Sequence, residues 1–162
     1  MENNGIRVIR VSDVEPFSPR DTQDIFYSRM LIDNQSAGSE HLVVNEFTLK
    51  CGKSSYKGSH PMPYDEVYYV LKGKGFLVLE DDEERKYEIE PGIIAFIPCG
   101  VQHHLINSDD EDMVLLTIMH KIPVKGVNSL YDSRIEEWNT SFRMKENAKG
   151  VKYSVITPDK QL

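Results

Sequence analysis

Cysteines, long apolar runs and basic clusters are all scarce in this chain of 162 residues. The two cysteines, Cys51 and Cys99, lie far apart and form no CxxC pair, so we expect free thiols in a reducing compartment. No apolar stretch approaches the roughly 20 residues that span a bilayer. The N-terminal segment MENNGIRVIR lacks the apolar core of a signal peptide. We therefore expect a soluble, cytoplasmic protein.

The charge balance is acidic. The formal net charge is -7, and the densest charged run is EDDEER at residues 80–85. The chain has no basic block and no interleaving of basic with aromatic residues, so nucleic acids and anionic membranes are poor partners. Because charge runs usually face water, we expect residues 80–85 to form a solvated loop.

Short apolar runs separated by turn residues fill the middle of the chain. A chain of this length fits one domain, which buries roughly 70% of its unfolded surface. The pattern predicts strands at residues 6–11, 27–33, 42–49, 66–71, 76–80, 86–90, 93–98, 103–107 and 113–120. Short strands at close, regular spacing indicate an all-β fold, an antiparallel barrel or jelly roll.

The chain divides by pattern into three parts. We expect an N-terminal arm with early strands over 1–39, a β-barrel core over 40–120 and a C-terminal extension over 121–162. Apolar residues recur at roughly helical spacing within 128–144, which predicts a short helix in the extension. The isolated run at 6–11 and the open sheet edges of such a barrel lead us to expect a homodimer.

Two stretches place chemically active residues at fixed offsets. The first, HPMPYDEVYYVLKGKG, contains His60, Met62, Glu66 and Gly73. The second, GIIAFIPCGVQHHLIN, contains Gly92, Pro98, Gly100, His103 and Asn107.

These stretches together resemble the two motifs of the cupin superfamily, G-x5-HxH-x3,4-E-x6-G and G-x5-PxG-x2-H-x3-N. The second motif is matched at every position. In the first, Met62 stands where a second histidine is usual, and the leading glycine is displaced, with Gly52 and Gly58 on either side of its place. The resemblance covers roughly residues 40–120 and implies a small β-barrel with an internal metal.

Alternation of side chains along strands then suggests a ligand set. If His60, Glu66 and His103 all point into one barrel, they supply two imidazoles and one carboxylate. This set suits a divalent transition metal (iron, manganese, nickel, zinc or copper) with open coordination positions. The competing interpretation is structural, with strand histidines and a surface glutamate. Asn107 is expected to support the strand rather than to touch the metal.

Met62 leaves three alternatives open. It lines the pocket beside a three-ligand site, it ligates weakly through its thioether sulfur, or the site is free of metal and the barrel is a binding cup. We favour the three-ligand site, because a soft sulfur is a poor ligand for the harder metals.

The same alternation predicts the lining of a substrate pocket. Its expected members are Tyr56, Met62, Tyr68, Phe96 and Leu105, with Tyr56 and Tyr68 as candidate catalytic proton donors. The motif strands carry no arginine cluster of the kind that phosphosugars or dicarboxylates need. We therefore expect a small, largely neutral or aromatic ligand.

The resemblance implies a metal-dependent enzyme acting on a small organic molecule by isomerase, lyase or cyclase, or oxygenase chemistry. It does not choose among these reactions, because one fold hosts many functions. The alternative is a non-catalytic barrel that binds or senses a small molecule, with or without a metal.

Overall fold

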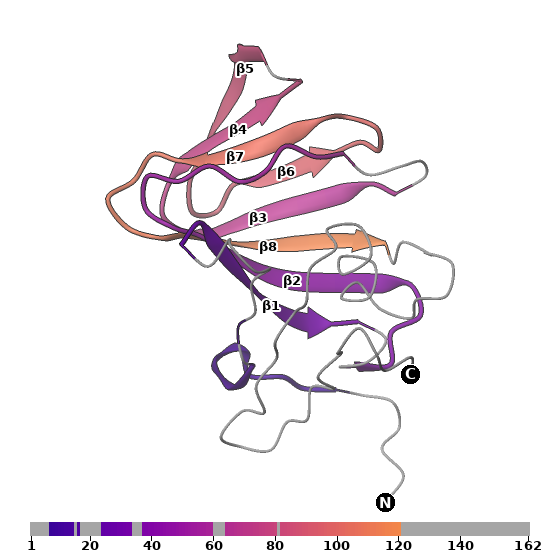
Figure 1. Cartoon of the computed structure of the whole chain (residues 1–162). Coiled ribbons are helices and arrows are strands. Elements are labelled where there is room, and N and C mark those ends of the chain that lie inside the picture. Colours follow the sequence, from indigo (N-terminus) through magenta and orange to yellow (C-terminus); the bar gives the residue numbers. More distant parts are fainter. Residues whose placement is uncertain are drawn as a thin grey trace, which may run out of the picture.

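The computed structural model of the chain describes residues 7–14, 16, 24–33, 37–59, 64–80 and 82–120. These residues form one short 3₁₀ helix and eight strands (Figure 1). The elements are η1 (Val11–Asp13), β1 (Phe26–Ile32), β2 (Leu42–Leu49), β3 (Glu66–Lys72), β4 (Gly75–Leu79), β5 (Asp82–Ile89), β6 (Ile94–Ile97), β7 (His103–Asn107) and β8 (Met113–His120).

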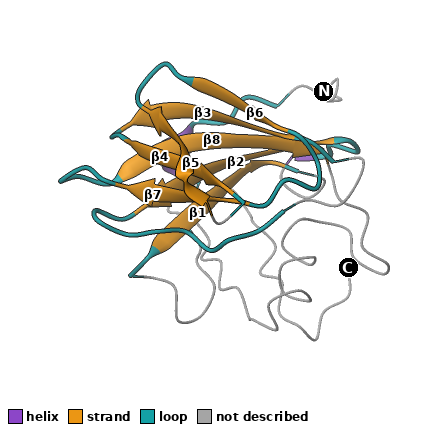
Figure 2. Cartoon of the chain, turned by 90° about the horizontal axis from the view of Figure 1, so that it is seen from above, coloured by secondary structure: helices purple, strands orange, loops and turns teal. Residues whose placement is uncertain are grey.

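The strands pair antiparallel in two sheets. A five-stranded sheet has the order β1-β2-β8-β3-β6, and a three-stranded sheet has the order β5-β4-β7. Viewed from above, the described loops gather at the two ends of the strands (Figure 2). Because the chain crosses repeatedly between the sheets, the architecture is the predicted all-β jelly roll.

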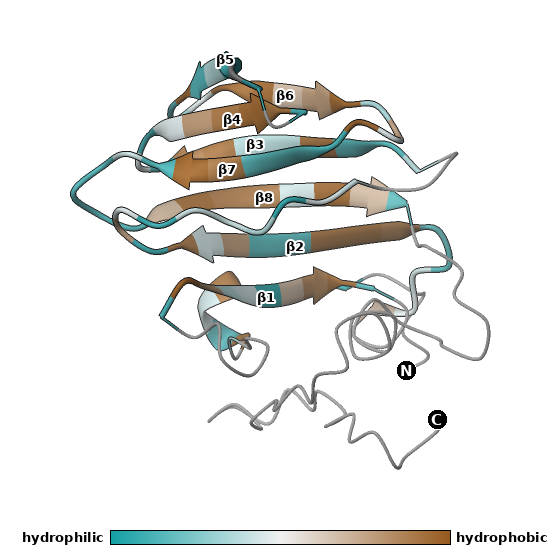
Figure 3. Cartoon of the chain, turned by 45° about the horizontal axis from the view of Figure 1, so that its top comes forward, coloured by the Kyte–Doolittle hydropathy of each residue, from teal (hydrophilic) through white to brown (hydrophobic). Residues whose placement is uncertain are grey.

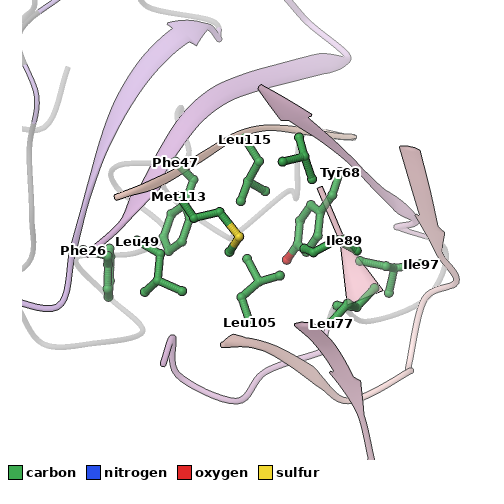
Figure 4. Close-up of a cluster of buried hydrophobic side chains, with 11 residues drawn as sticks. Phe26, Phe47, Leu49, Tyr68, Leu77, Ile89, Ile97, Leu105, Met113 and Leu115 are labelled. Atoms are coloured by element: carbon green, nitrogen blue, oxygen red, sulfur yellow. The ribbon is translucent and has the colours of Figure 1, made fainter. Parts of the chain in front are cut away.

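An apolar core fills the space between the sheets. Leu115 and Phe47 reach it from the five-stranded sheet, while Leu77 and Leu105 reach it from the three-stranded sheet (Figure 4). Burial alternates along β8 with the period of two that a strand imposes. Each fully buried aliphatic side chain contributes about 1.5–3 kcal/mol, so this core is the main source of stability.

Most predicted strands are confirmed, and two predictions are wrong. Residues 7–10 have no regular structure and Val11 begins η1, so the described part of 6–11 is not a strand. The charged run at 80–85 is largely strand, because Asp82–Ile89 forms β5 and pairs with β4. The Arg85 guanidinium forms ion pairs with Glu80 (Nη1 to Oε2, 2.7 Å) and Asp82 (Nε to Oδ2, 3.4 Å). These ion pairs offset the acidic charge and allow the run to form a water-exposed strand.

Other predictions concern residues outside this description. The predicted helix within 128–144, His60 and Met62 all lie outside the described residues. Within the described ranges, no helix is long and apolar enough to cross a membrane.

Candidate functional site

The second sequence motif forms the turns around β6 and brings His103 to the start of β7. Gly92 has φ 92° before β6, and Gly100 has φ 81° between β6 and β7. Glycine adopts this left-handed region without the steric cost that a side chain would bring. The Cys99 N–H donates to the Asp65 carboxylate at 2.9 Å, which ties the second turn to the residue before β3. The motif therefore fixes His103 relative to the start of β3.

Three predicted site residues come together inside the barrel. Glu66 opens β3 and is 3% exposed, while His103 opens β7 and is 6% exposed. The His103 Nε2 atom lies 3.4 Å from Glu66 Oε2 and 2.9 Å from the Tyr68 hydroxyl. The rings of Tyr68 and His103 meet edge to face, with centroids 5.7 Å apart. Figure 4 shows the Tyr68 ring among the aliphatic side chains of the core.

The backbone determines which nitrogen of His103 is available. His103 Nδ1 lies 2.9 Å from the Val101 carbonyl oxygen. A carbonyl oxygen only accepts hydrogen bonds, so Nδ1 carries the proton in the neutral ring. The lone pair of Nε2 therefore faces Glu66 and Tyr68, and the Tyr68 hydroxyl donates to it.

The surroundings of His103 also shift its pKa. Burial disfavours the charged imidazolium and lowers the pKa. The hydrogen bond and negative charge of Glu66, together with the Val101 carbonyl, outweigh burial and raise the pKa above its ordinary value of 6.5. Glu66 thus favours a positive charge at this position, whether that charge is a proton or a metal ion.

The chemistry of this pair fits a divalent transition metal. A buried carboxylate faces an imidazole nitrogen whose ring is oriented by a carbonyl, as metal-binding histidines usually are. Among the described residues, no group of three histidine, cysteine, aspartate or glutamate side chains could hold a metal. The structure therefore brings together two of the three predicted ligands, Glu66 and His103, and the third, His60, lies outside the described residues. The predicted roles of His60 as a metal ligand and of Met62 in or beside the site stay predictions.

Of the remaining pocket residues, the structure turns Leu105 inward and Phe96 outward. Leu105 is 2% exposed in the core, whereas Phe96 is 64% exposed. The inward prediction for Phe96 is wrong, because β6 pairs with β3 so that Ile97 lies opposite Glu66 and Phe96 opposite Val67. Counting the alternation back from Pro98, beyond the end of β6, shifts the assignment by one residue.

Tyr56 is not brought to this cluster. Its side chain is 55% exposed, and its ring contacts Phe26 edge-on at 6.0 Å. Among the described contacts, none joins Tyr56 to Glu66, Tyr68 or His103. Tyr68 is therefore the better candidate for the proton donor.

Asn107 has the structural part that the sequence predicts. Its side-chain NH₂ donates to the carbonyls of Leu49 at 3.0 Å and Glu111 at 2.8 Å, and its oxygen accepts from the Asp109 N–H at 2.9 Å. These bonds fix the turn that follows β7.

Two inward polar residues were missed from the sequence. Asn45 on β2 lies opposite Thr117 on β8, and Thr117 lies opposite Tyr68 on β3. The alternation of side chains along each strand could have revealed them. Asn45 lies between the inward residues Val43 and Phe47 on β2, and Thr117 lies between Leu115 and Met119 on β8.

Comparison with known proteins identifies the family. A family model described as a cupin domain matches residues 45–119. The polyketide cyclase RemF from Streptomyces resistomycificus has the same fold, with a TM-score of 0.62 and 26% identity over 71% of this chain and 79% of that chain. Residues 45–119 form a cupin domain. A Klebsiella pneumoniae protein with a double-stranded β-helix domain matches this cupin in fold, with a TM-score of 0.57 and 16% identity over 71% of this chain and 90% of that chain.

Curated relatives match only part of this cupin. Glucose-6-phosphate isomerase from Thermococcus litoralis is 40% identical over 55 residues, which are 33% of this chain and 29% of that enzyme. The chain spans less than half the length of the first curated relatives that it matches.

Proposed function

We propose that this cupin is a metal-dependent enzyme that acts on a small, largely neutral or aromatic organic molecule. The observation that carries the proposal is the buried convergence of Glu66, Tyr68 and His103, with the Tyr68 hydroxyl 2.9 Å from His103 Nε2. Such a cluster suits proton transfer beside a Lewis acid, so isomerase or cyclase chemistry fits better than oxygenation. Relatives named as a polyketide cyclase and as isomerases support this choice.

Each residue has a distinct part in this proposal. Glu66, His103 and His60 would hold the divalent metal, which when bound supplies Lewis-acid polarisation of a substrate oxygen. The Tyr68 hydroxyl is placed to give a proton to the bound substrate, or to take one from it. Leu105 and Ile97, 2% and 3% exposed, keep water away from this exchange.

The charges of the interior favour a neutral substrate. No lysine or arginine is among the buried described residues. Arg29 is held by Glu46 at 2.8 Å and by the Val14 carbonyl at 2.9 Å, so it already has structural partners. A phosphate group would lack a counter-charge here. The substrate of the isomerase relatives, as their name gives it, is therefore a poorer guide than a neutral ring compound.

Hydrogen exchange tests this proposal. The full chain, loaded with Mn²⁺, is incubated in D₂O with a panel of neutral ketones and hydroxyketones, and exchange at the carbon beside the carbonyl, above the rate without protein, is followed by mass spectrometry. We expect exchange that chelation with EDTA abolishes. Binding of the panel without exchange, and without sensitivity to EDTA, would instead indicate a binding protein.

One observation favours a second function, a non-catalytic barrel that binds or senses a small molecule. The Tyr68 hydroxyl already satisfies His103 Nε2, the atom that a metal would need. This alternative predicts that ligand affinity is the same in the wild type and in His103→Ala.

We also propose that this cupin is a cytoplasmic homodimer. Edge strand β6 supports the dimer, because Ile94 and Phe96 on its outer face are 68% and 64% exposed. Sedimentation at high protein concentration is expected to give a dimer, and Phe96→Asp is expected to weaken it. A monomer at every concentration contradicts this assembly.

A further inference from the structure

A row of polar side chains crosses the inner face of the five-stranded sheet and ends at the candidate site. Asn45 is fully buried, and Thr117, which lies between Asn45 and Tyr68 in register, is 5% exposed. Figure 3 shows a hydrophilic stretch midway along β2, between hydrophobic stretches. The row connects the centre of the sheet to the hydroxyl that contacts His103.

This polar row lies between two separate apolar clusters. On one side, Phe47 lies opposite Leu115, and both belong to the larger cluster. On the other side, Val43 lies opposite Met119, and both belong to the smaller cluster. Apolar side chains at 45 and 117 would have joined the clusters into one core, so the polar row interrupts the packing of the sheet.

Two atoms of the row are buried without a partner. The Asn45 NH₂ donates to the buried Ser28 hydroxyl at 3.3 Å. The Asn45 Oδ1 and Thr117 Oγ1 atoms have no hydrogen-bond partner among the described residues. A buried polar atom without a partner destabilises a protein, and native structures seldom keep one without a reason. A ligand inside the barrel provides that reason.

We propose that Asn45 and Thr117 form a subsite that binds a hydroxyl group of the substrate. This rests on the proposed function, because the same molecule is to be acted on at Tyr68. The ligand O–H would donate to Asn45 Oδ1, and its oxygen would accept from the Thr117 hydroxyl. The ligand class is a neutral alcohol or phenol, since neither side chain is charged.

The spacing of the sheet sets the size of this ligand. Neighbouring strands lie about 4.8 Å apart, so the backbones at Asn45 and Tyr68, two strands apart, are separated by roughly 10 Å. The row is therefore short, and a ligand of about one ring is the class that we test. One hydroxyl would lie at Asn45 and Thr117 while the reacting end lies at Tyr68.

The first part of the test measures the protein without ligand. Thr117→Val removes the unpartnered hydroxyl and keeps the shape, so we expect the melting temperature to rise by about 2–4 °C. Thr48→Val is expected to raise the melting temperature in the same way, and it is the matched control for the binding measurement that follows. Thr48 is 1% exposed and also has an unpartnered hydroxyl among the described residues, but it alternates with the inward residues Phe47 and Leu49 and lies off the row. A lower melting temperature in Thr117→Val would mean that its hydroxyl has a structural bond, and would overturn the subsite.

The second part measures binding to the full chain loaded with Mn²⁺. Calorimetry compares resorcinol with 1,3-dimethoxybenzene, which lacks its hydroxyl donors. We expect the wild type and Thr48→Val to prefer resorcinol by about tenfold or more. Thr117→Val and Asn45→Leu are expected to lose this preference. If Asn45→Leu does not fold, the near-isosteric Thr117→Val decides alone.

Manganese content, measured in the same samples, separates the two proposals. The wild type could hold its metal and yet show no preference for resorcinol, because it binds both compounds equally or binds neither. Either result overturns the subsite and leaves the metal centre standing. A preference that persists in Thr117→Val also overturns it. A preference that requires Asn45 and Thr117 in protein that binds no metal supports the subsite and overturns the metal-dependent function.

Discussion

At the scale of single residues, the Val101 carbonyl decides how His103 can act. It accepts from Nδ1 at 2.9 Å and so directs Nε2 toward Glu66 and Tyr68. The backbone of β7 and the turn before it thus set the orientation of the imidazole ring. The role proposed for Tyr68 differs from those of Glu66 and His103, because a neutral hydroxyl is suited to donating a proton rather than to holding the metal.

Replacing Tyr68 separates proton transfer from metal binding. We expect Tyr68→Phe to keep its metal, because Glu66 and His103 are untouched, and to lower the rate of hydrogen exchange by about 10²–10⁴-fold. Tyr69→Phe is the control, since Tyr69 is 38% exposed and neighbours Tyr68 on the opposite face of β3. Metal analysis and the D₂O exchange assay give the two readouts. Unchanged exchange in Tyr68→Phe would remove Tyr68 from the reaction.

At the scale of elements, the close approach of β4 and β7 requires glycine at position 75. Gly75 lies opposite Asn107, and a Cβ atom added there would overlap the Ile106 carbonyl oxygen. We expect Gly75→Ala to lower the free energy of unfolding by about 2–4 kcal/mol, because a backbone atom cannot move aside cheaply. Urea denaturation measures the loss.

Gly58→Ala serves as the control for this substitution. Gly58 also bridges to β7, at His103, but a Cβ atom added there meets nothing within 4 Å. Equal stability of the two variants would contradict the steric argument.

Asp112 connects the end of β2 to the start of β8. Its carboxylate accepts from Lys50 Nζ at 2.9 Å and from the Cys51 N–H at 3.1 Å. Partial burial would raise the pKa of Asp112, but these hydrogen bonds and the lysine charge lower it below its ordinary value of 3.8. A lowered pKa stabilises the fold above pH 3.8, and this contribution is lost as the pH falls through the folded-state value.

Asp112→Asn is therefore expected to cost about 0.5–1 kcal/mol near neutral pH, and about nothing at pH 2. Thermal or urea unfolding across this pH range measures the difference from wild type. Glu88→Gln, at an exposed position on β5, is the control and should show little effect at either pH. A cost for Asp112→Asn that does not change with pH would contradict the assigned charge interaction.

Predictability from sequence follows how local each signal is. β8 was predicted with its bounds because its alternation is contained within eight residues. Glu66 and His103 were predicted to face the same interior because each lies in a spaced motif, and the structure places them side by side. Phe96 was misplaced because the facing of β6 depends on its pairing with β3, which the sequence of β6 does not contain. Asn45 and Thr117 become neighbours only through the pairing of β2 with β8, and the candidate subsite was missed for this reason.

At the scale of the whole molecule, two sheets close over an apolar core that the polar row divides. The two described candidate ligands come from different sheets, Glu66 from the five-stranded and His103 from the three-stranded one. A metal held between them would therefore link the sheets as well as serve the reaction. Chemistry and fold would thus be coupled, and metal binding is expected to raise the melting temperature.

Elemental analysis of the purified full chain beside His103→Ala tests the metal centre most directly. His120→Ala, at an exposed histidine at the end of β8, is the matched control. We expect about one iron, manganese, nickel, zinc or copper ion per chain in the wild type and in His120→Ala, and its loss in His103→Ala. Wild-type protein that holds no metal after incubation with divalent ions, or metal that persists in His103→Ala, would contradict this expectation.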